Sequence, residues 1–173
     1  MLFRSPYKLT VIDTPGFGNS EGLKGDKLIA KQIKELFSIS PPNGIDHLNG
    51  IGIVTQYGQA RLTPTQEYIL TSILSMFDLS QNIFMMVTSA ESQKPPVIQA
   101  IKDAGITHCD KYFKFNNSTL FANNKETGES FDEAFWKMNF QSFEAFFADF
   151  AKAESIHLDL TNEVLEEDRK SVV

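Results

Sequence analysis

The chain has 173 residues, of which 42% are hydrophobic and 22% charged, and its formal net charge is −6. A chain of this length and composition can bury one substantial core, which excludes disorder as the default state. The acidic balance argues against a sequence-independent grip on nucleic acid or anionic lipid, because those partners are bound through clustered Lys and Arg. The single cysteine allows no internal disulfide, and we expect an intracellular, cytoplasmic protein without an intrinsic membrane span.

The first predicted elements are a strand, a loop and a helix. Residues 8–13 read Lys-Leu-Thr-Val-Ile-Asp, a short apolar segment that predicts a strand ending at Asp13. A turn-rich stretch follows, and residues 25–38 then carry apolar side chains at the spacing of an amphipathic helix. Residues 50–55 read Gly-Ile-Gly-Ile-Val-Thr, which predicts a second strand too apolar to have a solvent-facing side.

The middle of the chain continues the alternation. A cap residue at Thr63, a proline after it and a Gln three residues beyond the cap predict a helix from residue 64 to about 77. Residues 82–88 predict a third strand that is buried on both sides. Two prolines at 95 and 96 open another helix, and Gly105 is placed to end it.

The last third of the chain predicts an edge strand and a long helix. Residues 111–116 alternate polar and apolar side chains, as an edge strand does. From Trp136 to Phe150, aromatic residues recur at steps of four and three, which predicts a strongly amphipathic helix. Most of these aromatic side chains are expected in the core, and a surplus one such as Phe146 is a candidate for an interaction surface. Residues 158–173 predict a charged tail or the start of a helix.

Strands that alternate with helices and are themselves nearly all apolar predict an α/β fold. Its mainly parallel sheet should have helices on both faces, in three layers, within one domain over residues 1–157. Ligands of such folds bind at the carboxyl ends of the strands. The residues that follow Ile12, Val54, Val87 and Phe115 are therefore the places to look for a site.

The best-defined motif is Asp13-Thr14-Pro15-Gly16, an Asp-x-x-Gly element at the end of the first predicted strand. The carboxylate can hold Mg²⁺ through a water, and the Gly amide can approach a terminal phosphate because no side chain blocks it. An ordinary turn that caps a strand is the alternative interpretation of the same residues.

Residues 9–18, which read LTVIDTPGFG, resemble the third guanine-nucleotide motif of the septin and AIG1 (immunity-associated) GTPases. The resemblance continues through residues 61–64 and the helix after them. It implies a P-loop NTPase-like domain that binds GTP or GDP, with Asp13, Thr14 and Gly16 at the phosphates and Mg²⁺ at Asp13 only when nucleotide is bound. It also implies a homodimer formed across the nucleotide face.

The same resemblance places two later segments beside the guanine base. Thr88-Ser89-Ala90-Glu91 stands where the family has (N/T)-K-x-D, which implies base contacts from Thr88 and Glu91. Glu91 is one methylene longer than the family Asp, and Ser89 cannot stack over a base as the family Lys does. Asn117 follows the next strand and resembles an Asn-Asn element of the AIG1 type. Simple polar loops remain the alternative at both places.

No G-x-x-x-x-G-K-[ST] occurs in the sequence, so the backbone cradle and Lys that grip phosphate in this family are missing. We therefore expect a fragment without the N-terminal strand, the P-loop and the first helix. Phe17 stands where small GTPases orient the attacking water with a Gln, so hydrolysis should be weak or absent, and no catalytic residue is predicted. The alternatives are a non-catalytic scaffold acting through protein contacts and an unrelated α/β enzyme that uses Asp13.

Overall fold

The fold is taken from a computed structural model, which describes residues 8–16, 25, 28–29, 31–33, 35–36, 39, 45–76, 82–91, 93–106, 111–122 and 131–157. The described residues between 25 and 36 are helical, as the spacing of apolar side chains predicts. The elements that follow are β1 (His47–Leu48), β2 (Ile51–Gln56), α2 (Pro64–Met76), β3 (Ile83–Thr88), α3 (Pro96–Asp103), β4 (Tyr112–Lys114), the short 3₁₀ helix η1 (Asn117–Phe121), α4 (Asp132–Phe150) and β5 (Ile156–His157). The predicted tail over 158–173 lies outside the described residues.

The central sheet is parallel and has the order β2-β3-β4. Ile51 pairs with Ile83 at one end of the register and Gln56 with Thr88 at the other, while Val87 pairs with Lys114. A separate two-stranded antiparallel sheet joins β1 to β5. The prediction of an α/β fold with a parallel sheet is confirmed.

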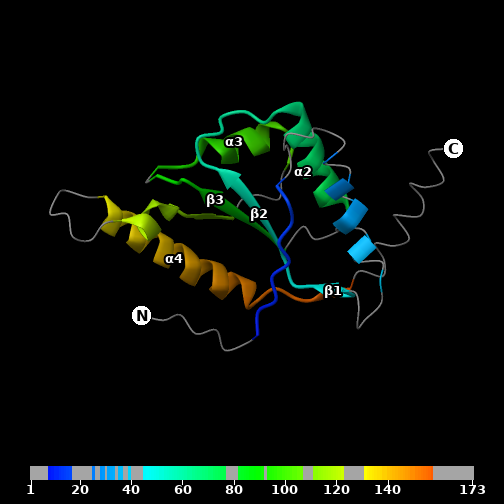
Figure 1. The fold of residues 1–173 in the computed structure, drawn as a ribbon. Coiled ribbons are helices and arrows are strands. Elements are labelled where there is room, and N and C mark those ends of the chain that lie inside the picture. The colour runs from blue at the N-terminus through cyan, green and yellow to red at the C-terminus, as the bar shows by residue number, and fades with distance from the viewer. Residues whose placement is uncertain are drawn as a thin grey trace.

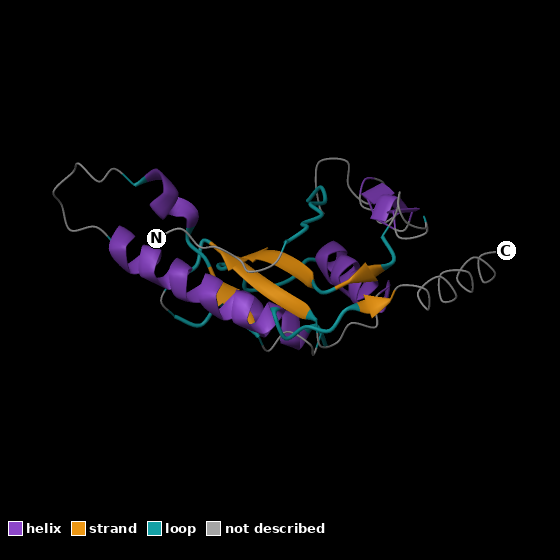
Figure 2. Ribbon diagram, turned by 90° about the horizontal axis from the view of Figure 1, so that it is seen from below, coloured by secondary structure: helices purple, strands orange, loops and turns teal. Residues whose placement is uncertain are grey.

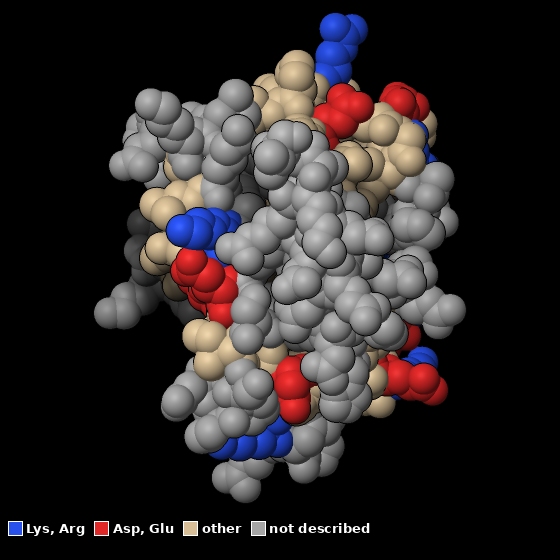
Figure 3. All heavy atoms as spheres, turned by 90° about the vertical axis from the view of Figure 1, so that its right-hand side faces the viewer, with Lys and Arg blue, Asp and Glu red and all other residues tan. Residues whose placement is uncertain are grey.

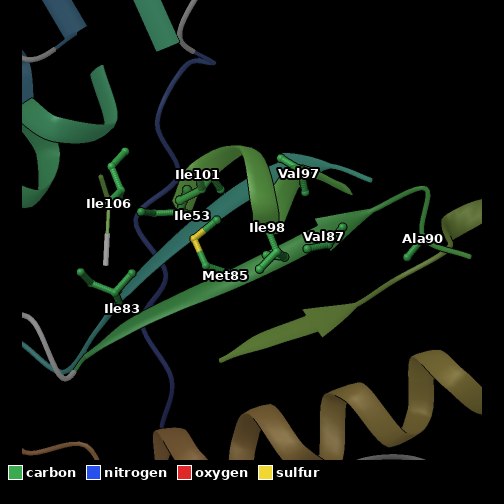
Figure 4. Close-up of a cluster of buried hydrophobic side chains, with 9 residues drawn as sticks. All are labelled: Ile53, Ile83, Met85, Val87, Ala90, Val97, Ile98, Ile101 and Ile106. Atoms are coloured by element: carbon green, nitrogen blue, oxygen red, sulfur yellow. The ribbon is translucent and has the colours of Figure 1, made fainter. Parts of the chain in front are cut away.

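Helices cover both faces of this sheet, with α2 and α3 on one face and α4 on the other (Figures 1 and 2). The first face holds a core of aliphatic side chains, shown in Figure 4, in which Met85, Val87 and Val97 have no exposed surface. The second face is aromatic: Phe84 and Phe113 pack against Phe146 of α4, with ring centroids 5.4 and 5.6 Å from it. Both faces of β3 are buried, as predicted for this strand.

Local signals fix the ends of two helices. Thr63 Oγ1 accepts from the Gln66 amide at 3.2 Å while Gln66 Oε1 accepts from the Thr63 amide at 2.9 Å, so the predicted capping box begins α2. At the end of α3, Gly105 has φ 78° and its N–H donates to the Lys102 carbonyl at 2.9 Å. A residue with a Cβ adopts this left-handed conformation only at a cost, which explains why glycine ends the helix there.

The predicted strand over residues 8–13 is wrong. Residues 8–16 have no regular secondary structure, and their side chains are exposed, with Val11 at 75%. A strand is stabilised by the hydrogen bonds it makes to a neighbouring strand. Among the described residues, no backbone hydrogen bond or strand pairing joins this segment to the sheet. The segment therefore has the composition of a strand, but no strand in the described part of the chain pairs with it.

Two expectations about burial also fail. The prediction that the second strand has no solvent-facing side is wrong, because Gly52, Val54 and Gln56 of β2 are exposed. The aromatic cluster beneath the sheet is built from β3, β4 and α4 and contains no side chain of β2, so this face of β2 is uncovered. Phe146 is not an interaction surface, since it packs against the sheet. Within the aromatic stripe, Trp136 is 57% exposed instead.

Candidate functional site

The predicted base-side segments follow neighbouring parallel strands and meet at the same edge of the sheet. The N–H of Phe115 donates to the Val87 carbonyl at 2.8 Å, and the N–H of Ala90 donates to the Phe115 carbonyl at 3.0 Å. These bonds extend the pairing of β3 with β4 beyond the strands themselves. The structure therefore brings the segment 88–91 beside the segment 116–117, as the sequence predicts from their place after two strands.

The first of these segments turns sharply at Ser89. Thr88 is half-buried, and its hydroxyl donates to the Thr55 carbonyl of β2 at 3.1 Å, so this side chain ties two strands together. Ser89 has φ 51°, in the left-handed region that non-glycine residues rarely adopt. Ala90 then points into the aliphatic core with no exposed surface, while Glu91 is exposed. The turn thus leaves the Glu91 carboxylate accessible to a ligand.

The second segment contains two adjacent Asn residues with different surroundings. Asn116 is half-buried: its Nδ2 donates to the Ala90 carbonyl at 3.1 Å, and its Oδ1 accepts from the Ser118 amide at 3.1 Å. Asn117 is exposed at the start of η1. The residue selected from the sequence as a ligand contact is therefore the accessible member of the pair, and its neighbour holds the loops.

We call the junction of the segments 88–91 and 116–117 the corner. Two residues that the sequence did not single out, Asn139 and Lys114, complete it. Asn139 of α4 is 8% exposed, and its amide bonds both backbone polar groups of Asn116, at 2.7 and 2.9 Å. Lys114 of β4 donates from Nζ to the carbonyls of Glu91 at 3.2 Å and Gln93 at 3.4 Å. We call Lys114, Asn116 and Asn139 the polar clamp. One signal in the sequence could have pointed to Asn139, because it is the only Asn among the Phe residues of α4. An amide buried on such a helix needs hydrogen-bond partners.

The phosphate-side candidates are not part of this corner. Asp13, Thr14 and Gly16 are exposed in the segment without secondary structure, and a Cβ on Gly16 would meet no atom within 4 Å. In the part of the chain that the structure describes, no three His, Cys, Asp or Glu side chains gather as metal ligands. Mg²⁺ is usually held by one or two carboxylates together with substrate phosphates. Asp13 supplies one such carboxylate and by itself does not constitute a magnesium site.

Charge around the described residues is mixed. Figure 3 shows Lys and Arg interspersed with Asp and Glu on the face that it presents. The clearest ionic group lies at the other end of β4, where Asp149 lies 3.3 Å from both Lys111 and Lys152. Burial raises the pKa of Asp149, but hydrogen bonds and charge attraction from the two lysines outweigh it and hold the pKa below its ordinary value. No described helix has the length and apolar character needed to cross a membrane.

No protein-family model matches the chain, and no curated protein matches it. Any functional assignment therefore depends on the geometry of the corner and on the motifs of the sequence.

Proposed function

We propose that the chain is part of a guanine-nucleotide-binding domain of the septin/AIG1 type, with a P-loop NTPase-like sheet, and that its described part carries the base-binding side. The observation that supports this most is the hydrogen-bonded junction of segments 88–91 and 116–117 at the carboxyl edge of a parallel sheet. Ligands of open α/β sheets bind at that edge. Two of the exposed polar side chains there, those of Glu91 and Asn117, have the donors and acceptors that a purine base requires.

The proposed role of Glu91 is to accept hydrogen bonds from the base. A carboxylate offers two acceptor oxygens and can therefore pair with two neighbouring N–H donors, which guanine presents and adenine does not present in the same arrangement. Asn117 can add one donor or acceptor to the base or the ribose. We expect GTP or GDP as ligand, with Thr88 in a supporting position because its hydroxyl is already bonded to β2.

We propose binding rather than hydrolysis. Asp13, Thr14 and Gly16 would contribute to phosphate and Mg²⁺ only once the nucleotide is held, and the sequence has no Gly-rich Lys-containing loop to hold its phosphates. The affinity of this chain for nucleotide should accordingly be weak and dominated by the base. A homodimer across the nucleotide face is part of the same proposal and would bring a second copy to this edge.

Isothermal titration of the 173-residue chain with GTP–Mg²⁺ and with ATP–Mg²⁺ tests the proposal. We expect weak binding of GTP and weaker binding of ATP. Glu91→Gln should lower the ratio of GTP affinity to ATP affinity by at least about tenfold, because one good hydrogen bond to a charged group contributes about 1.5–3 kcal/mol. Glu144→Gln, at an exposed carboxylate of α4, is the matched control and should leave the preference unchanged. Equal heats for the two nucleotides with a folded wild-type chain would refute guanine recognition.

Three exposed aromatic side chains favour a second candidate, a non-catalytic scaffold that acts through protein contacts. Phe121 at the end of η1 is 87% exposed and Phe131 just before α4 is 79% exposed, and Trp136 adds a third exposed ring. Exposed aromatic side chains of this size are typical of interaction surfaces. Light scattering of the chain with and without GTP, compared with Phe121→Ser, separates the candidates. An assembly that is independent of nucleotide and is lost in Phe121→Ser would favour the scaffold.

A further inference from the structure

We infer that Asn139, on helix α4, is a positioning residue that sets the spacing of the two loops carrying Glu91 and Asn117, an inference that rests on the proposed function. The residue itself is buried and presents no atom to a ligand at the edge of the sheet. Its effect would pass through Asn116 and Thr119, the two residues that it bonds, to the accessible side chains. It is therefore distinct from the candidate contact residues named above.

The side-chain amide of Asn139 makes the two hydrogen bonds to the backbone of Asn116 that a neighbouring strand would make. Its Oδ1 accepts from the Asn116 N–H at 2.7 Å, and its Nδ2 donates to the Asn116 carbonyl at 2.9 Å. Asn116 lies just past β4, at the edge of the sheet, where no further strand is available among the described residues to pair its backbone. The side chain of Asn139 thus supplies an acceptor for the N–H of this half-buried residue and a donor for its carbonyl.

From Asn116 the constraint reaches both loops. Its Nδ2 holds the Ala90 carbonyl, one residue before Glu91, and its Oδ1 holds the Ser118 amide, one residue after Asn117. The Thr119 hydroxyl donates to the Asn116 carbonyl at 3.2 Å and also accepts from Asn139 Nδ2 at 3.1 Å, which ties η1 to α4. The two candidate base contacts are each one residue from an atom whose place depends on Asn139.

Asn139 is a buried polar residue on the face of α4 that otherwise packs aromatic side chains against the sheet. On the same side of α4, Phe146 and Phe150 pack into the aromatic cluster, so an apolar side chain would suit this face of the helix. A buried amide costs free energy unless its donors and acceptor are all satisfied. Here all of them go to one loop, at the one edge of the sheet where ligands of this fold class bind.

Lys114 adds an independent constraint on the other loop, the one that follows β3. Its ammonium bonds the carbonyls of Glu91 and Gln93 from β4, so the loop after β3 is held both before and after Glu91. Preorganised loops recognise ligands better than loops that must be ordered on binding, because the ordering entropy has already been lost on folding. The polar clamp therefore provides the rigidity that a base-reading loop without a lysine over the ring would need.

The test compares Asn139→Leu, Asn139→Asp and Asn116→Ala with the control Gln141→Leu, which removes an exposed amide of the same helix. Two quantities are measured at a temperature where each variant is folded: amide hydrogen exchange at Asn116 and Ser118, and the ratio of GTP to ATP affinity. We expect Asn139→Leu to speed exchange at both amides by about tenfold or more and to abolish the GTP preference. Asn139→Asp keeps the acceptor for the Asn116 N–H and should be intermediate, and the control should match the wild type.

The outcomes separate the inference from the function on which it rests. Unchanged exchange in the Asn139 variants overturns the inference. Faster exchange with an unchanged GTP preference also overturns it, because Asn139 is then only structural. If the wild-type chain does not prefer GTP, the proposed function has failed. Amide exchange then decides the inference alone: faster exchange in the Asn139 variants supports the control of loop spacing by Asn139, and unchanged exchange overturns it. Should Asn139→Leu fail to fold, Asn139→Asp provides the same comparison, and Asn116→Ala tests the links from Asn116 to the two loops.

Discussion

The corner formed by β3, β4 and α4 and the segment around Asp13 carry the two halves of one predicted site, and they differ sharply. At the corner, backbone pairing runs past the strand ends and the polar clamp joins three elements. Around Asp13, the described residues have no secondary structure and exposed side chains. The proposed base-binding half can therefore be built by the local fold alone, whereas the proposed phosphate-binding half requires partners that this segment lacks among the described residues.

The largest expected change in the free energy of unfolding comes from the buried face of the sheet, compared with the exposed face of β2. Met85→Ala removes a fully buried side chain and should lower the free energy of unfolding by about 2–5 kcal/mol. Val54→Ala, on the uncovered face of β2 where Val54 is 65% exposed, should lower it by less than about 1 kcal/mol. Urea denaturation measures both. Comparable losses would mean that the outer face of β2 is packed after all.

The turn at Ser89 should be next in size. Ser89→Val places a β-branched residue at φ 51°, and we expect it to be about 1–2 kcal/mol less stable than Ser89→Gly, which adopts this conformation without steric cost. Thermal unfolding of the two variants gives the comparison. If both variants unfold at the same temperature, Ser89 does not hold a left-handed turn and the geometry of the segment 88–91 must be different.

The ionic group at the other end of β4 should contribute less and only above acidic pH. The pKa of folded Asp149 is lowered, so its stabilisation is fully present above the ordinary carboxyl pKa of about 4 and is lost as pH falls through the folded value. Because the group is partly exposed, Asp149→Asn should cost only about 0.3–1 kcal/mol at pH 7. The difference from the wild type should shrink toward zero in strong acid. A cost that grows on acidification would contradict the sign of this shift.

The smallest effect belongs to the Asp13 segment. Val11→Ser should change the free energy of unfolding by less than about 0.5 kcal/mol, since the side chain is 75% exposed. The same substitution in β3, Val87→Ser, serves as the buried counterpart and should cost several times more. A loss above about 1 kcal/mol at Val11 would show that the segment pairs or packs in solution.

The sequence predicted those parts of the fold in which local chemistry and burial agree. Apolar runs gave β2 and β3, the capping box began α2, and Gly105 ended α3. It did not predict which apolar segment lacks a neighbour, because the segment 8–13 has the same composition whether or not a strand lies beside it. For the same reason the open face of β2 could not be read from its residues.

For the candidate site, the sequence identified the accessible groups and missed those that hold them. Glu91 and Asn117 follow strands and are polar, which is a local signal. Asn139 lies more than 20 residues further along, and only the packing of α4 brings its amide to Asn116. Whether an Asn in such a helix faces solvent or a loop depends on how the helix is rotated about its own axis. Because α4 carries aromatic residues on two sides, their spacing does not determine that rotation.

The central claim is that the corner reads a guanine base without the phosphate-binding half. Backbone ¹H–¹⁵N spectra of the 173-residue chain, titrated with GTP–Mg²⁺ and separately with ATP–Mg²⁺, test it most directly. We predict that the amides of Glu91 and Asn117 shift with GTP, shift less with ATP, and that the amide of Asp13 stays in place with both. Shifts of equal size for the two nucleotides, no shift at the corner, or shifts centred on Asp13 would contradict the claim.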